Sequence, residues 1–292
     1  MTPAQHYRKQ SYTNSPDDDL TNTFAVTTRW GGRPRPRATP WSRPRDYEMT
    51  LALALLLLGT LYDQSIVKLL DRQFSSAEIS YILLDTSTNA VIAQRWQHAD
   101  QPIPAGSLVK PFVALAASAN GKFPALTCDP KQCWLQKGHG TIDISNAIAH
   151  SCNSYFLQLA PLANPEFLSR FGLAPPPQNA SAETWIGLGR EWKLSPLSIA
   201  RAYSILASYP EAAPVLAGML QSSQSGTGRA IATKALVKTG TAACAHPAGQ
   251  PGDGYVVAMV YGYTLLVQMH GVPGATTAAT AGRMLNTILR GK

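Results

Sequence analysis

The chain has 292 residues, of which 45% are hydrophobic and 14% charged, and its formal net charge is +8. This composition indicates a substantial buried core and excludes a chain that is disordered over most of its length. The positive charge gathers in one stretch rich in Pro and Gly, at Arg29, Arg33, Arg35, Arg37, Arg43 and Arg45. The stretch has no base-stacking aromatics beyond Trp30 and Trp41 and directly precedes an apolar run, so we expect no nucleic-acid partner.

The N-terminal region predicts a tail and a membrane-directed segment. Residues 1–48 have few aliphatic side chains and predict a disordered basic tail. The uncharged run MTLALALLLLGTLY follows at 49–62, with its arginines on the N-terminal side. We expect 49–70 to be an uncleaved anchor in the cytoplasmic membrane or, because the run is shorter than the roughly 20 residues of a spanning helix, the core of a cleaved signal. A buried helix of a soluble domain is the third interpretation.

The positive-inside rule places the N-terminus of an anchored chain in the cytoplasm. We therefore expect a single-pass protein of the inner (cytoplasmic) membrane, with the residues after about 70 outside the cytoplasm. Export after signal cleavage is the alternative.

From residue 79 the pattern indicates a globular domain over 79–290. EISYILLD, TSTN and AVIAQRW predict a β-hairpin, and SLVKPFVALAASAN predicts a helix from Ser107 to about Asn120. Further helices are expected at 142–150, from 155, at 165–171 and at 196–208, the last two preceded by an N-cap and a proline. Strands return in ALVKTGTAAC, YVVAMVY and TLLVQMH, before a closing helix at 276–289.

Strands thus occupy both ends of this domain and helices its middle. We predict an α/β (α+β) fold, in which the N- and C-terminal strands form a central antiparallel sheet flanked by helices, with an inserted helical subdomain. The catalytic cleft is expected between the sheet and that subdomain.

The four cysteines suit an oxidising compartment. Cys128 and Cys133 enclose the short loop CDPKQC, which predicts a local disulfide, with two reduced thiols as the alternative. We expect no metal site, because no second ligand pair with zinc-like spacing follows, and no cofactor.

Other cysteines and histidines receive no role from the sequence. Cys152 and Cys244 are far apart in the chain, and spacing does not establish whether they meet. His139 lies between two glycines and His150 beside Ser151, and we interpret them as turn and helix-end residues.

Three short motifs carry the candidate chemistry, in the chain order used by acyl-serine transferases and hydrolases. They are Ser107-Leu108-Val109-Lys110, Ser151-Cys152-Asn153 and Lys238-Thr239-Gly240. Each motif alone is common, and the order and local context of all three together make them informative. Gly240 lies on a β-prone strand, where it indicates either a bulge or a close approach of substrate backbone.

The spacing within the first motif suits nucleophilic catalysis. A lysine three residues after a serine lies on the same face of a helix, so Lys110 can take the proton of Ser107 if it is neutral. Burial and a nearby positive charge, which Lys238 can supply, favour the neutral form by lowering the pKa. The amide of Ser107 at a helix start is a natural oxyanion donor.

The chain resembles the transpeptidase domain of penicillin-binding proteins, of the serine D,D-transpeptidase and β-lactamase superfamily. PAGSLVKPF is similar to the nucleophile region, CWLQKGHGTIDISNAIAHSCNSYFLQLA to the segment with the second motif, and GTGRAIATKALVKTGTAA to the approach to the third. WIGLGREWKLSPLSIARAYSILAS is similar to the family's glycine-bearing stretch and the helix after it. The resemblance covers most of residues 79–290.

The resemblance implies a role for each motif residue. Ser107 would attack the carbonyl between two D-alanines of a peptidoglycan stem peptide and Lys110 would accept its proton, while Ser151 would relay a proton to the leaving amine. Lys238 would provide positive potential and help to orient Ser151. Substrate contacts would come from Asn153, Thr239, Gly240 and Thr241, with the amides of Ser107 and Thr241 as the oxyanion hole.

The resemblance also implies partners and rival functions. β-Lactams would acylate Ser107, and cell-wall synthesis proteins are expected partners. The leading hypothesis is a membrane-anchored D,D-transpeptidase or D,D-carboxypeptidase. A serine β-lactamase is the rival enzyme, and a catalytically silent β-lactam sensor or scaffold is the non-enzymatic alternative.

Overall fold

The computed structural model describes residues 62–118, 121–243 and 252–290. The predicted tail at 1–48, the apolar run at 49–61 and Cys244 lie outside these described residues. Within the described ranges, no helix is both long and apolar enough to cross a bilayer.

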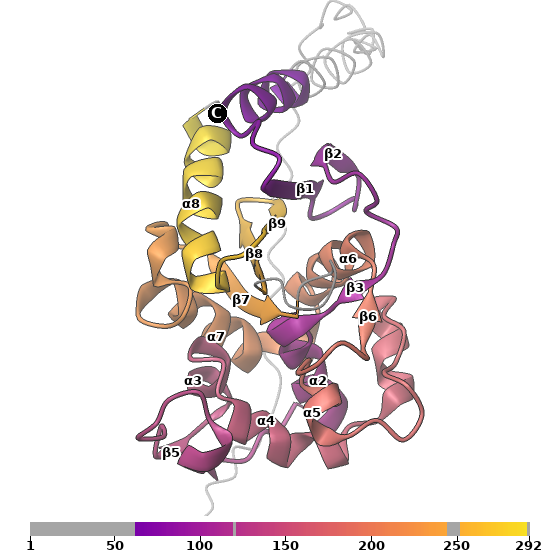
Figure 1. The fold of residues 1–292 in the computed structure, drawn as a ribbon, viewed down its shortest axis with the longest axis vertical. Coiled ribbons are helices and arrows are strands. Elements are labelled where there is room, and N and C mark those ends of the chain that lie inside the picture. The colour runs from indigo at the N-terminus through magenta and orange to yellow at the C-terminus, as the bar shows by residue number, and fades with distance from the viewer. Residues whose placement is uncertain (1–61, 119–120, 244–251, 291–292) are drawn as a thin grey trace, which may run out of the picture. The chain divides into compact units, whose positions relative to one another are not determined.

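Five strands form the central antiparallel sheet, in the order β2-β1-β9-β8-β7 (Figure 1). Their bounds are β1 Ile79–Asp85, β2 Val91–Arg95, β7 Leu236–Ala242, β8 Asp253–Val260 and β9 Tyr263–Met269. The N-terminal hairpin joins the C-terminal strands where β1 pairs with β9, with Tyr81 opposite Val267. This confirms the predicted sheet built from both ends of the domain.

Both faces of the sheet are buried. Successive side chains of a strand point to opposite faces, so Ile82 and Leu84 of β1 join one hydrophobic cluster while Tyr81 and Leu83 join another. The apolar runs of β1 and β8 therefore lack the apolar–polar alternation of a half-exposed strand.

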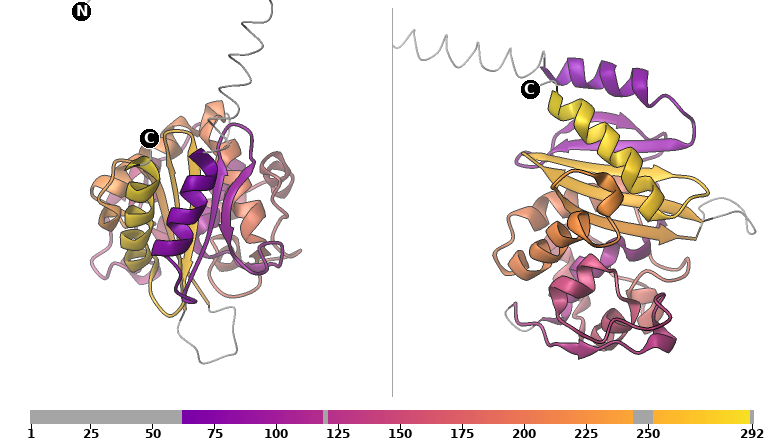
Figure 2. Two further views of the ribbon diagram at one scale, coloured as in Figure 1. Left: turned by 90° about the horizontal axis from the view of Figure 1, so that it is seen from above. Right: turned by 90° about the vertical axis from the view of Figure 1, so that its left-hand side faces the viewer.

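Two helices cover one face, α8 (Gly274–Arg290) and the helical segment 62–73 (Figure 2). The Tyr62 hydroxyl donates to the carbonyl of Ile288 at 2.8 Å. Ile66 and Leu70 are 1% and 0% exposed and belong to the cluster beneath these helices. The packed core therefore extends beyond the expected boundary at residue 79, and the described part of the predicted anchor segment, 62–70, belongs to it.

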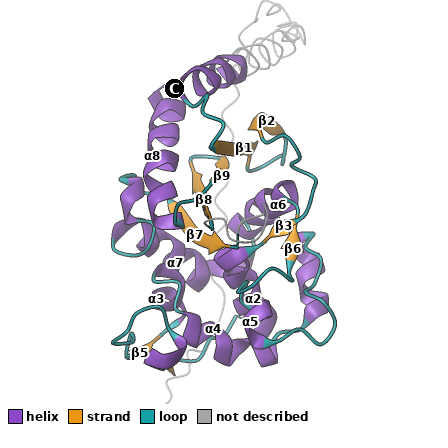
Figure 3. Cartoon of the chain, viewed as in Figure 1, coloured by secondary structure: helices purple, strands orange, loops and turns teal. Residues whose placement is uncertain are grey.

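The opposite face carries α6 and, beyond it, the predicted helical subdomain (Figure 3). The α-helices on this side are α2 Lys110–Ala117, α3 Ile144–Ala149, α4 Asn153–Leu159, α5 Ala182–Trp185, α6 Pro196–Ala207 and α7 Ala213–Gln224. Short strands pair as β3 (Ile103–Pro104) with β6 (Lys193–Leu194), and as β4 (Leu126–Thr127) with β5 (Thr141–Ile142).

Two predicted helices differ in kind from those observed. The segment from Ser107 divides into a 3-10 turn, η1 (Gly106–Val109), and α2, so Ser107 precedes the α-helix. The segment after Asn164 is a 3-10 helix, η4 (Pro165–Phe171), with the predicted cap in place. The other 3-10 turns are η2 Pro130–Gln132, η3 Ala160–Leu162, η5 Pro210–Ala212 and η6 Arg229–Ile231.

Candidate active site

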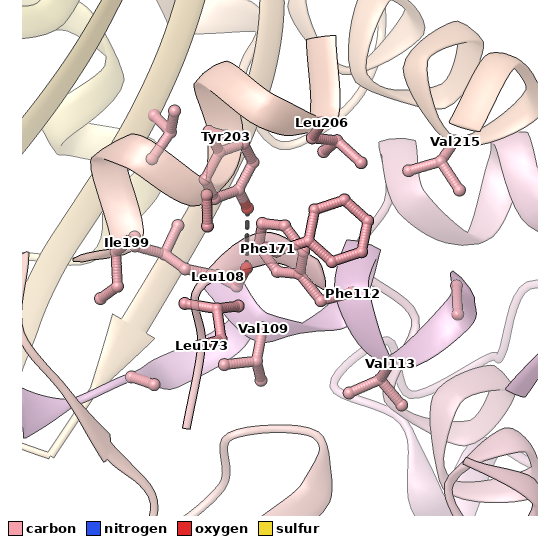
Figure 4. Packing of buried hydrophobic residues seen from close by; sticks show 14 of the residues in the cluster. Leu108, Val109, Phe112, Val113, Phe171, Leu173, Ile199, Tyr203, Leu206 and Val215 are labelled. Atoms are coloured by element: carbon pink, nitrogen blue, oxygen red, sulfur yellow. Dashed lines mark hydrogen bonds between the residues drawn. The ribbon is translucent and has the colours of Figure 1, made fainter. Parts of the chain in front are cut away.

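Buried aromatic side chains hold the turn that carries Ser107. The hydroxyl of Tyr203, on α6, donates to the carbonyl of Leu108 at 2.7 Å (Figure 4). The ring of Phe112 contacts those of Tyr203 and Phe171, with centroids 5.1 Å apart in both cases. This packing fixes the backbone that directly follows the half-buried Ser107.

Lys110 joins the first motif to the second. Its fully buried amine donates to the carbonyl of Ser151 at 3.0 Å, to the Ser151 hydroxyl at 3.3 Å and to Asn153 Oδ1 at 2.5 Å. Burial lowers the pKa of Lys110 to about 7, against an opposing effect of Cys152 and Cys133. The amine is thus substantially neutral near neutral pH, as a general base must be.

A second lysine, Lys238 of the third motif, also contacts Ser151. The Lys238 amine donates to Ser151 Oγ at 2.9 Å and to the carbonyl of Thr239 at 2.6 Å. Burial, and then the charge of Lys110, hold the pKa of Lys238 well below its usual value. Ser151 itself has a φ of 50°, a left-handed conformation that non-glycine residues rarely adopt and that recurs at functional sites.

The third motif lies on β7, directly beside the turn that carries Ser107. β7 pairs with β8 without a register shift, which rules out the bulge interpretation of Gly240. A Cβ at Gly240 would lie 3.3 Å from Leu108 Cγ, so a glycine lets the strand approach the turn closely. The hydroxyl of Thr239 donates to that of Thr227 at 2.6 Å, and the hydroxyl of Thr241 accepts from the amide of Gly274 at 3.0 Å.

These elements enclose a cavity of about 340 Å³. The predicted residues on its wall are Ser107, Ser151, Asn153, Thr239, Gly240 and Thr241, and the remaining wall is Trp134, Leu188, Thr227, Pro273 and Ala275. Lys110 and Lys238 lie behind this wall, where both contact Ser151. The structure therefore brings the residues of all three motifs to one place.

The model of the penicillin-binding protein transpeptidase domain matches residues 79–290, most of the chain. The chain belongs to this family. A search of curated proteins gave no match.

Solved structures of penicillin-binding proteins share the fold. Pseudomonas aeruginosa PBP2 in complex with WCK 5153 is similar with a TM-score of 0.60 and 17% identity, over 78% of this chain and 74% of that one. The apo transpeptidase domain of Burkholderia pseudomallei penicillin-binding protein 3 has a TM-score of 0.58 and 15% identity, over 80% of this chain and 92% of that one. The D,D-transpeptidase domain of an Eggerthella lenta peptidoglycan glycosyltransferase has a TM-score of 0.60 and 16% identity, over 77% of this chain and 81% of that one.

Five cavity residues of this transpeptidase domain were not predicted from the sequence, and two of them, Trp134 and Thr227, carry polar groups. Trp134 is 53% exposed on the cavity wall and follows Cys133, in a loop interpreted only as a disulfide loop. Thr227 lies in the quoted approach to the third motif, where its small polar side chain gave no signal of its own.

The predicted disulfide between Cys128 and Cys133 is wrong for this structure, in which Cys128, Cys133 and Cys152 are free thiols. The backbone of Cys128 continues the β4–β5 pairing, with its amide donating to the carbonyl of Gly140 at 2.9 Å. The thiol of Cys128 lies beside that of Cys152, with the two sulfurs 3.4 Å apart.

Proposed function

We propose that this chain is a serine D,D-transpeptidase or D,D-carboxypeptidase, which acts on D-Ala-D-Ala stem peptides through an acyl-enzyme on Ser107 and binds β-lactams covalently. One observation carries the proposal. Ser107 lies on the same cavity wall as Ser151, Asn153 and Thr239, with the amine of Lys110, whose pKa is lowered to about 7, buried behind them.

Acylation begins with the neutral amine of Lys110. It accepts the proton of Ser107 as Oγ forms a bond to the carbonyl carbon, and the carbonyl oxygen becomes an oxyanion. The backbone amides of Ser107 and Thr241 would donate to that oxyanion. Asn153, whose side-chain oxygen accepts a hydrogen bond from Lys110, lines the same cavity and would orient the substrate amide.

Collapse of this intermediate breaks the bond to the leaving amine. The amine takes a proton from the hydroxyl of Ser151, and the ammonium of Lys110 returns one to Ser151, which restores both groups. A second amine or a water molecule then attacks the acyl-enzyme, giving a cross-link or a shortened stem peptide.

The third motif would bind the terminal carboxylate of the substrate. The hydroxyls of Thr239 and Thr241 lie on the cavity wall, and Lys238 lies behind Thr239. An arriving carboxylate favours the charged form of a nearby amine, so substrate binding opposes the effect of burial on Lys238.

We also propose that the catalytic domain lies outside the cytoplasm, tethered to the inner membrane. The support is the stretch of arginines at 29–45, followed by the apolar run at 49–62. Protease applied to spheroplasts would degrade a domain so placed, whereas a cytoplasmic domain would be protected.

Intact-protein mass spectrometry of the full chain incubated with a penicillin tests the nucleophile. We expect one equivalent of adduct, lost in Ser107→Ala and retained in Ser118→Ala, whose serine caps the far end of α2. No adduct with intact drug would leave a silent scaffold, and no adduct with destroyed drug would make the chain a β-lactamase. Both reactions release the terminal D-alanine, so the acceptor of the acyl group separates them. Transfer of the shortened stem peptide to an added amine would mark a transpeptidase, and its transfer to water would mark a carboxypeptidase.

A further inference from the structure

Four side chains that the mechanism does not use converge behind the second motif: Cys128, Cys133, His139 and Cys152. Their ligand atoms all lie within 4.8 Å of one another. Cys152 and Cys128 are buried, and Cys133 and His139 are half-buried. The three thiols and the imidazole thus form one enclosed cluster rather than a set of separate surface groups.

Four separations within the cluster are close to those of a tetrahedral zinc site. Bonds of about 2.3 Å to sulfur and about 2.0 Å to nitrogen place two ligand atoms of a tetrahedron roughly 3.5–3.8 Å apart. The Sγ of Cys152 lies 3.4 Å from that of Cys128 and 3.9 Å from that of Cys133. His139 Nδ1 lies 3.6 Å from the sulfur of Cys128 and 3.3 Å from that of Cys133.

The backbone presents these four ligands from two elements. β4 and β5 pair at the base of a loop that begins with Cys128 and ends just after His139. Gly138 and Gly140 have φ values of 66° and 68°, and these left-handed turns on either side of His139 suit glycine. Cys152 comes from the opposite side, as the N-cap residue of α4.

Disulfide chemistry does not account for this cluster. Three sulfurs are present, so any disulfide among them leaves the third thiol over and gives His139 no role. A tetrahedral metal uses all four groups at once. Three thiolates and one imidazole, with no open position, are a ligand set of structural Zn²⁺ sites.

We propose that Cys128, Cys133, His139 and Cys152 bind one Zn²⁺ as a closed structural site, which ties the 128–140 loop to the second motif. Cys152 lies between Ser151 and Asn153, so the metal fixes the backbone that presents both side chains. The site has no open coordination position and takes no part in the reaction. Its four ligands act on the reaction only by holding Ser151 and Asn153 in position.

The same loop places Trp134 on the cavity wall. Trp134 follows Cys133, and its indole N–H donates to the carbonyl of His150 at 3.0 Å. The ring of His139 stacks on that of His150, with centroids 5.6 Å apart. A metal at the cluster therefore holds two parts of the cavity wall together, Trp134 and the second motif.

Metal content tests the site without reference to activity. We expect about one zinc per full-length chain purified without chelator, and cobalt substitution should give the visible bands of a tetrahedral ion with thiolate charge transfer. Cys133→Ser and His139→Ala should bind far less than one equivalent. Cys244→Ser, which removes the remaining cysteine of the chain, should keep the full equivalent.

Two results would overturn the site. One is wild-type protein without zinc or cobalt bands whose mass is lower by two hydrogens, since the thiols would then be paired as a disulfide. The other is full metal content in both Cys133→Ser and His139→Ala. The cobalt spectrum of the wild type keeps the proposal testable even where a variant fails to fold.

The positioning role rests on the proposed function and has a separate test. Removing zinc with a chelator should slow acylation by a penicillin about tenfold to a hundredfold, and added Zn²⁺ should restore the rate. Bound zinc with an acylation rate that does not change on its removal would overturn the positioning role. Bound zinc in a chain that never forms an adduct would overturn the proposed function and leave the metal site standing.

Discussion

Lys110 and Lys238 are both fully buried, and both donate to the hydroxyl of Ser151. Burial removes hydration from each amine and so lowers the pKa of both, and the charge of Lys110 lowers the pKa of Lys238 further. At least one amine is therefore available to accept a proton near neutral pH. The left-handed backbone of Ser151 places its hydroxyl between them.

Acylation should depend on pH through Lys110. Its amine accepts a proton only when neutral, and its pKa is about 7, so the rate constant should rise with pH through about 7 and level off above it. Below that value the rate should fall about tenfold per pH unit. Stopped-flow measurement with a chromogenic β-lactam from about pH 5 to about pH 9 gives the profile.

Thermal unfolding at each pH is the control for this profile, because loss of folded protein also lowers the rate. A rate constant that stays flat over this range while the protein remains folded would contradict Lys110 as the base.

At the scale of elements, close backbone contacts set the position of the turn that carries Ser107. Gly187, which follows α5, packs so tightly against Gly106 that a Cβ there would overlap the Gly106 carbonyl. The amide of Ala105 also donates to the carbonyl of Trp192 at 3.0 Å. The segment after α5 thus supports the turn from the side opposite β7.

Substituting Gly187 tests this contact, and Gly172 provides a matched control. Both glycines have a left-handed backbone conformation, with φ values of 80° at Gly187 and 67° at Gly172. A Cβ added at Gly172, however, would meet no atom within 4 Å. Gly172→Ala should cost about 1–2 kcal/mol of stability and leave the acylation rate unchanged. Gly187→Ala should cost more and also slow acylation, because the Gly106 carbonyl must move.

Denaturant unfolding and the acylation rate constant are measured for both variants. Equal stability losses, with unchanged acylation in each, would mean that Gly187 does not support the turn.

At the scale of the whole molecule, the helical segment 62–73 completes one of the two cores. Leu70 and Ile66 pack into the cluster formed by α8 and one face of the sheet, and Phe74 follows them into it. The hydroxyl of Thr287, on α8, donates to Gln73 at 2.7 Å. A fragment that begins after this helix would expose part of the core.

Leu70→Ala should therefore destabilise the folded protein by about 2–5 kcal/mol, the usual cost of a cavity in a packed core. The neighbouring Leu69 is 37% exposed, so Leu69→Ala should change stability by less than about 0.5 kcal/mol. Chemical denaturation of the full chain gives both values. Similar small losses in the two variants would mean that the helix is not part of the cooperative core.

The amino-acid sequence by itself predicted the strands, most helices and the three motifs, whose residues the structure brings together. Hydrophobic runs and turn residues predicted β1, β2 and the C-terminal strands, and the caps Asn164 and Ser195 predicted the starts of η4 and α6. These signals are local, because a cap or a periodic run acts within a few residues of itself. Motif order likewise predicted which residues line the cavity.

Only the tertiary structure decided how distant groups meet. His139 and Cys152 join Cys128 and Cys133 because the β4–β5 pairing and the start of α4 bring them together, which spacing along the chain does not express. The same holds for the approach of Lys110 and Lys238 to Ser151 and for the packing of 62–73 on α8. Such contacts depend on long-range packing, which local sequence patterns do not encode.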